Sequence, residues 1–110
     1  MKMIVALLRS EQLPFVKQSL YDMHIRQFTV TTTLGTATKS EQQSYRGVKR
    51  EVSLTQRIRL ELVLNDAQVD TAVRGIRAGA KESGGWGRIF VLPVEDSITI
   101  WTGERGPNTL

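Results

Sequence analysis

The pattern of apolar residues divides the chain into short segments of strand length. Residues 3–8 are continuously apolar, which is typical of a strand covered on both faces. Residues 28–34 are rich in β-branched and aromatic types, and residues 57–64 and 96–101 alternate apolar with polar positions. Residues 89–92 form one more short apolar run. The pattern therefore predicts five strands.

Two other segments place apolar residues every three or four positions, as amphipathic helices do. The first runs from Leu13 to near His24 and has Pro14 in its first turn, where proline is tolerated; the second runs from Val69 to Ala80. The order of strands and helices predicts an α+β, ferredoxin-like fold, a split β-α-β sandwich with an antiparallel sheet and both helices on one face. Since two helices cannot cover both faces, we expect self-association through the open face.

Residues 36–53 show no sustained apolar period, and we interpret them as a long polar loop. Loops of this length are uncommon in small domains and are usually functional or disordered. Arg46, Lys49 and Arg50 form a basic cluster with Glu51 beside it. The cluster is either a solvated loop tip or a plug that docks on an acidic partner, and the length of the loop favours docking.

Composition limits the chemistry further. The 110 residues suit a single domain, residues 1–110, and the absence of cysteine together with one histidine, His24, excludes disulfides, thiolate nucleophiles and multi-histidine metal sites. We expect His24 at the surface, near the end of the first helix. The net charge of +4 suits an anionic partner. The apolar run 3–8 is too short for a signal peptide or a membrane span, so we expect a cytoplasmic protein without direct membrane insertion.

Several short segments, taken in their order and spacing, resemble the PII signal-transduction proteins over essentially the whole chain. They are Thr29-Val30-Thr31, Tyr45-Arg46-Gly47, Glu61-Leu62-Val63, Gly87-Arg88-Ile89-Phe90-Val91 and Thr102-Gly103-Glu104-Arg105-Gly106. The resemblance implies a compact homotrimer of ferredoxin-like subunits that binds ATP or ADP between subunits. It also implies that residues 36–53 form the T-loop, which docks on a target such as an ammonium channel, another membrane transporter or a nitrogen-metabolism enzyme.

The resemblance also assigns residues. It places Thr29, Glu61 and Val63 around an adenine, Arg57 near a terminal phosphate, and the glycine turn, residues 83–88, around the phosphates. The implied nucleotide-binding set is Thr29, Thr38, Lys39, Arg57, Glu61, Val63, Gly84, Gly85, Gly87 and Arg88. The implied docking set of the T-loop is Tyr45, Arg46, Gly47, Lys49 and Arg50.

The chain departs from the family where phosphates are bound. Two family arginines of the last strand are absent, and the segment here reads Thr99-Ile100-Trp101-Thr102. Each lost charged contact removes about 1.5–3 kcal/mol, so we expect ATP, ADP or AMP to bind weakly or through replacements. Candidate replacements are Arg57, Arg59, Arg88 and Arg105, with Trp86 or Trp101 stacking on a base. The loop start also lacks the family's magnesium-chelating glutamine, so Mg²⁺ and 2-oxoglutarate are not expected in the usual mode.

Four functions remain to be compared. The first is a trimeric sensor that binds an adenine nucleotide or a related small anion and controls a target through the T-loop. The second is an interaction protein on the same scaffold that has lost its ligand. An enzyme is disfavoured because the sequence shows no paired carboxylates and no Ser/His arrangement. RNA binding through the sheet is disfavoured because the predicted central strands carry Thr, Leu and Arg rather than spaced aromatics.

Overall fold

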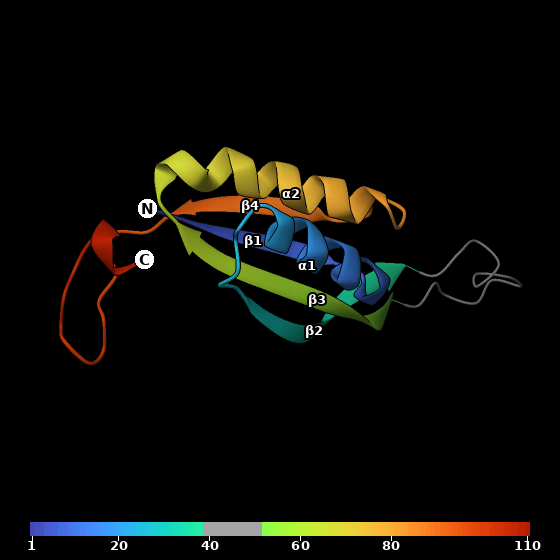
Figure 1. Cartoon of the computed structure of the whole chain (residues 1–110). Helices are drawn as coiled ribbons and strands as arrows, with labels where there is room; N and C mark the ends of the chain where they lie inside the picture. Colours follow the sequence, from blue (N-terminus) through green and yellow to red (C-terminus); the bar gives the residue numbers. More distant parts are fainter. Residues whose placement is uncertain (39–51) are drawn as a thin grey trace, which may run out of the picture.

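Four strands form one antiparallel sheet in the computed structural model, which describes residues 1–38 and 52–110. They are β1 (Lys2–Leu8), β2 (Thr29–Thr38), β3 (Val52–Leu64) and β4 (Arg88–Pro93), in the spatial order β2-β3-β1-β4. Helices α1 (Leu13–Asp22) and α2 (Val69–Lys81) lie side by side on one face of this sheet (Figure 1). This arrangement confirms the ferredoxin-like α+β fold.

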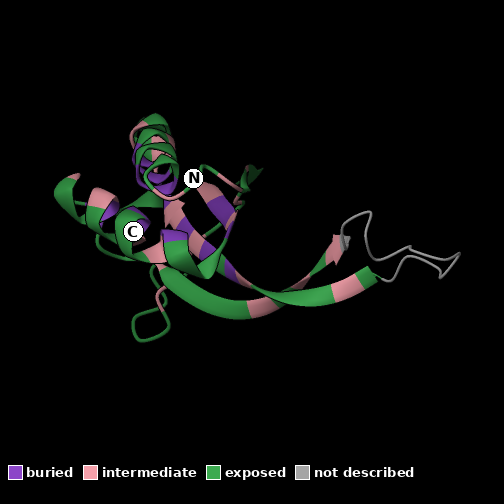
Figure 2. Cartoon of the chain, turned by 90° about the vertical axis from the view of Figure 1, so that its right-hand side faces the viewer, coloured by how far each residue is buried: buried purple, intermediate pink, exposed green. Residues whose placement is uncertain are grey.

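The core lies between the helices and one face of the sheet, as the buried residues of Figure 2 show. Side chains of a strand alternate between faces, and in β1 Ile4, Ala6 and Leu8 point toward the helices. Their partners in β3 are also buried, which continues the same apolar layer across the sheet. Val16 and Leu20 of α1 and Ala72 and Ile76 of α2 close this layer from the helix side. The apolar positions of the two predicted helices therefore face the core.

The two helices approach each other closely at Gly79. A Cβ atom at this position would lie 2.7 Å from the backbone oxygen of Phe15 and from the Cα atom of Val16, which no real side chain tolerates. Glycine is therefore required here by packing and not by backbone conformation. Among the helices of the described residues, none is long and apolar enough to cross a bilayer.

The long polar loop predicted for residues 36–53 is wrong at both ends. Strand β2 continues to Thr38 and β3 begins at Val52, and the two strands stay in register from Thr29↔Glu61 to Thr38↔Val52. The paired residues 33–38 and 52–57, here called the ribbon, project beyond the helices (Figure 2). Polar residues are tolerated in this pairing because it covers no core, and threonine favours extended backbone. Residues 39–51 lie outside the described part.

The strand predicted for residues 96–101 is also wrong. This segment folds into a loop that bonds to itself: the Thr99 amide donates to the Glu104 carbonyl at 2.9 Å, and the Asp96 carboxylate pairs with Arg105 at 2.9 Å. Only an isolated bridge, Ile98↔Arg105, has strand character. The alternation does not mark a buried face, because its apolar positions Ile98 and Ile100 are both exposed, as is Trp101 at the tip.

The open face of the sheet is apolar on one side and charged on the other. Phe90 and Leu92 of β4 are exposed beside Val5 of β1, whereas β3 places the Arg59–Glu61 ion pair on this face. The apolar half is a surface of the kind that the predicted self-association requires. The self-association stays a prediction.

Candidate functional site

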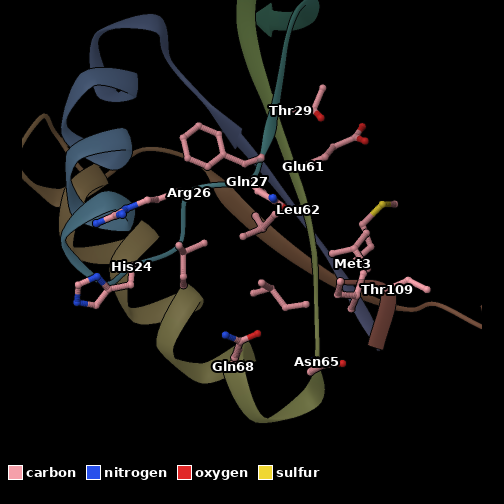
Figure 3. Close-up of a pocket in the computed structure, with 15 residues that line it drawn as sticks. Met3, His24, Arg26, Gln27, Thr29, Glu61, Leu62, Asn65, Gln68 and Thr109 are labelled. Atoms are coloured by element: carbon pink, nitrogen blue, oxygen red, sulfur yellow. The ribbon is translucent and has the colours of Figure 1, made fainter. Parts of the chain in front are cut away.

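A groove of about 830 Å³ lies where β2 begins and β3 ends. Thr29 pairs with Glu61 in the sheet, and Val63 follows on the same face of β3, so all three predicted adenine-contact residues line this groove (Figure 3). The segment after α1 forms another wall. It turns sharply at His24, whose φ of 63° is unusual for a residue other than glycine, and His24 is exposed, as predicted.

The groove combines apolar walls with a few polar groups, as ligand pockets do. The buried side chains Ile25, Leu62 and Leu64 line it together with the partly buried Phe28. Its polar groups come from the Glu61 carboxylate and from the side chains of Gln27, Asn65, Gln68 and Thr109. Thr29 and Glu61 lie on the open face of the sheet, whereas Leu62 and Leu64 face the helices, so the groove runs around the end of β3 and has a polar side and an apolar side (Figure 3). No pattern in the sequence pointed to Gln27 or Thr109 as lining residues.

The glycine turn lies at the other end of the sheet, between α2 and β4. Gly84, Gly85 and Gly87 have φ of 91°, 66° and 123°, conformations that favour glycine. A Cβ atom at Gly87 would lie 2.3 Å from the Leu7 carbonyl oxygen, so this position admits only glycine. The Gly85 amide donates to the Ala80 carbonyl at 2.9 Å and caps α2. This amide is therefore already used and is not free for a phosphate.

A small hollow of about 380 Å³ at this turn is lined by cations. Arg77 and Lys81 of α2 and Arg88 of β4 line it, and no carboxylate does so among the described residues. Its floor is apolar and includes Leu8 and Ile76. The turn thus offers positive charge beside backbone that is fixed in position, which is the setting that an anionic group needs.

Two guanidinium groups lie over the ring of Trp86, in the middle of the turn. The Arg57 Cζ atom is 4.6 Å from the ring centroid and the Arg9 Cζ atom is 5.2 Å from it, both within cation–π range. Arg57 was predicted as a phosphate ligand, and the structure places it at the turn. Sequence analysis missed Arg9, which precedes the first helix without any distinguishing pattern.

Gln12 is the buried polar side chain that fixes this turn, and sequence analysis missed it. Its amide nitrogen donates to the carbonyl oxygens of Trp86 at 2.8 Å and Ala80 at 3.2 Å, and its Oε1 accepts from the Arg9 amide at 2.8 Å. The side chain is fully buried. The signal was present in the sequence, because Gln12 lies four residues before Val16 and so on the buried face of the helical segment.

The predicted nucleotide residues that the structure describes do not lie together in one chain: one group is in the groove, another is at the glycine turn with Arg57, and Thr38 belongs to neither. Arg57 and Glu61 are four residues apart on β3, which is roughly 14 Å, and Val63 is farther still. Thr38 is paired with Val52 at the end of β2, roughly 30 Å along the strand from Thr29. Lys39 and the docking residues Tyr45, Arg46, Gly47, Lys49 and Arg50 lie outside the described residues. Within residues 1–38 and 52–110, no three His, Asp or Glu side chains cluster as metal ligands would.

Comparisons with known proteins match nearly the whole chain. The family model described as nitrogen regulatory protein P-II matches residues 1–104. The chain is 35% identical to nitrogen regulatory protein GlnK1 of Methanosarcina mazei over 114 residues, covering 100% of this chain and 97% of that protein. It is 35% identical to nitrogen regulatory protein P-II of Rhodospirillum rubrum and 34% identical to that of Azospirillum brasilense, each over 112 residues and the full length of both proteins. The matched region includes the groove, the glycine turn and the ribbon.

Proposed function

The chain belongs to the P-II family of nitrogen regulatory proteins, and from this premise we propose that it binds an adenine nucleotide, or a related small anion, between the subunits of a homotrimer. Membership confirms the resemblance seen in the sequence and makes the chain a regulatory signalling protein of the P-II type. In the proposed assembly, the groove of one subunit faces the glycine turn of its neighbour. The groove receives the base and the turn receives the phosphates of ATP, ADP or AMP.

The separation of the two groups carries this proposal. An apolar groove with polar edges lies at one end of the sheet, and a cation-lined turn lies at the other. A base and a phosphate chain have these two chemistries within one ligand. If a neighbouring subunit packs against the apolar half of the open face, the groove of one subunit can lie next to the glycine turn of the other at the subunit boundary.

The proposed output is a change in the T-loop that controls a target protein, including a membrane transporter or channel. The ribbon supports this output because of where its strands run. Strand β2 begins at the groove residue Thr29 and enters the ribbon at Thr33, which pairs with Arg57 beside the glycine turn, and the ribbon leads into the T-loop residues. A ligand that spans the groove and the turn therefore contacts both strands that support the T-loop.

A ligand-independent interaction protein is the second candidate, and the loop of residues 96–106 favours it. Thr99 and Trp101 stand where the family places phosphate-binding arginines, and Trp101 is exposed at the loop tip. Neither Thr99 nor Trp101 supplies a cation for a phosphate. The lost contacts amount to several kcal/mol, which corresponds to roughly two to four decades in affinity.

Calorimetry with ATP, ADP, AMP and cyclic nucleotides separates the two candidates. The proposed function predicts saturable heat for at least one of these ligands and a rise in melting temperature with ligand concentration. Arg88→Ala should weaken that binding by about tenfold or more, because Arg88 carries an exposed charge at the turn. No heat and no thermal shift with any of these ligands would favour the ligand-independent protein.

A further inference from the structure

We propose that Trp86 is a positioning residue: its indole holds the Arg57 guanidinium at the glycine turn, a phosphate-bearing anion bound there bonds to the N–H edge of that guanidinium, and this bond changes the base of the ribbon. This inference rests on the proposed function, since it needs the turn to receive the anionic end of a ligand. It adds a residue that links the ligand to the ribbon.

The indole of Trp86 is held by a rigid part of the molecule. Its backbone carbonyl accepts a hydrogen bond from the fully buried Gln12 at 2.8 Å. The neighbouring Gly87 is packed against the Leu7 carbonyl so closely that no Cβ atom fits. The backbone that carries the ring is therefore set by the core and does not depend on Arg57.

Arg57 connects this ring to the ribbon. It pairs with Thr33 across the two strands, and its side chain covers Gly35, where an added Cβ atom would lie 3.0 Å from the Arg57 Cγ atom. The guanidinium then reaches Trp86, with its Cζ atom 4.6 Å from the ring centroid. One side chain thus contacts both the base of the ribbon and the glycine turn.

The charges at this contact favour an incoming anion. Arg9 lies over the same ring at 5.2 Å, so two like charges share one aromatic surface. Among the described residues, no carboxylate lies within 4.0 Å of either guanidinium. An oxyanion forms charge-assisted hydrogen bonds with guanidinium N–H groups, which are stronger than cation–π contacts at exposed sites. An anion at the turn can therefore bond to the N–H edge of Arg57 while the ring keeps the flat face of the guanidinium in place.

The first experiment measures the fluorescence emission of Trp86 in the full chain that carries Trp101→Phe, so that Trp86 is the one tryptophan left. The ligand affinity of this Trp101→Phe chain is the reference for the variants below. Pyrophosphate, ADP and AMP are titrated, so that free phosphate chemistry is distinguished from nucleotide chemistry. The inference expects a saturable change in Trp86 emission with at least one of them. Trp86→Leu, followed by calorimetry, should weaken that ligand about fivefold to thirtyfold, because the ring no longer positions Arg57.

Conservative variants separate positioning from folding. Trp86→Phe keeps an aromatic face and should retain most of the affinity, whereas Arg57→Lys keeps the charge but not the planar stack and should resemble Trp86→Leu. Arg74→Gln is the control, since it removes an exposed arginine of α2 that lines neither the groove nor the hollow at the turn. The control should bind within about twofold of the reference.

The second experiment measures amide hydrogen exchange in residues 33–38 and 52–57 with and without saturating ligand. We expect ligand to change the exchange of these amides in the reference chain and not in Trp86→Leu, a difference that a purely structural role for the ring does not produce. If Trp86→Leu keeps the reference affinity and the same exchange response, this inference is overturned while the proposed function stands. If none of the three ligands binds, this inference is overturned, whereas the proposed function is overturned only if ATP and the cyclic nucleotides also fail to bind.

Discussion

Removing the buried amide of Gln12 should destabilise the fold and loosen the glycine turn at the same time. Gln12→Ala deletes three hydrogen bonds, to the Arg9 amide, the Ala80 carbonyl and the Trp86 carbonyl. Each contributes about 0.5–1.5 kcal/mol net, which gives about 3 kcal/mol together. The Ala80 carbonyl keeps its bond from the Gly85 amide, so most of the unsatisfied polarity falls on the other two groups.

The assay is denaturant unfolding of the wild type and the variant at one fixed protomer concentration, since assembly would make stability depend on concentration. Gln12→Met keeps most of the side-chain volume but loses the same three bonds, so it should still cost about 3 kcal/mol, which separates the hydrogen bonds from the cavity. Gln18→Ala is the matched control, because Gln18 is exposed and bonds only to Asp22 on the same helix, at 2.8 Å, among the described residues. It should cost less than about 0.5 kcal/mol.

The result that refutes this reasoning is a Gln12→Ala variant that unfolds within about 0.5 kcal/mol of the wild type. Such stability would mean that water or a rearranged turn replaces all three bonds. The turn would then not be fixed by the core, and the backbone of Trp86 would not be held independently of Arg57.

Two further predictions concern the turn and the chain start. Gly87→Ala should prevent soluble expression or lower the free energy of unfolding by more than about 3 kcal/mol, because its Cβ atom would lie 2.3 Å from the Leu7 carbonyl oxygen. Gly84→Ala is the control, since Gly84 has a φ of 91° but nothing within 4 Å of an added Cβ atom, and it should lower the free energy of unfolding by only about 1–2 kcal/mol. The Met1 ammonium, 3.0 Å from the Asp66 carboxylate, lowers the pKa of Asp66 by hydrogen bonding and by charge. At pH values above about 4, Asp66→Asn should therefore cause a small decrease in the melting temperature. At strongly acidic pH, where the carboxyl of the wild type is protonated, the substitution should have no effect. Equal decreases at neutral and strongly acidic pH would contradict this prediction.

Periodicity predicted the parts of the fold that cover the core. The helix from Val69 to Ala80 and the strands 3–8 and 89–92 were found where the sequence placed them, because burial of an apolar layer dictates their pattern. The same logic failed at residues 96–101, whose alternation has no neighbouring strand to pair with in the described chain. It also failed for residues 36–38 and 52–53, which are strand although polar, because their pairing covers no core.

The candidate site was predicted only in part, and the reason is physical. Thr29, Glu61 and Val63 share a groove because sheet register brings them together, and this register follows from correct strand assignments. The contact of Arg57 with Trp86 links residues far apart in the sequence through side-chain geometry, which no local pattern encodes.

Complementation between subunits tests the central claim most directly. Thr29→Arg should block the groove and Arg88→Glu should reverse the charge of the turn, so neither variant should bind the nucleotide alone. When the two variants are unfolded together, refolded as a mixture and examined by calorimetry, about a quarter of the subunit boundaries should combine an intact groove with an intact turn and bind with the wild-type affinity. A mixture that binds no nucleotide, while the wild type treated in the same way does, would show that the two groups do not act across a subunit boundary.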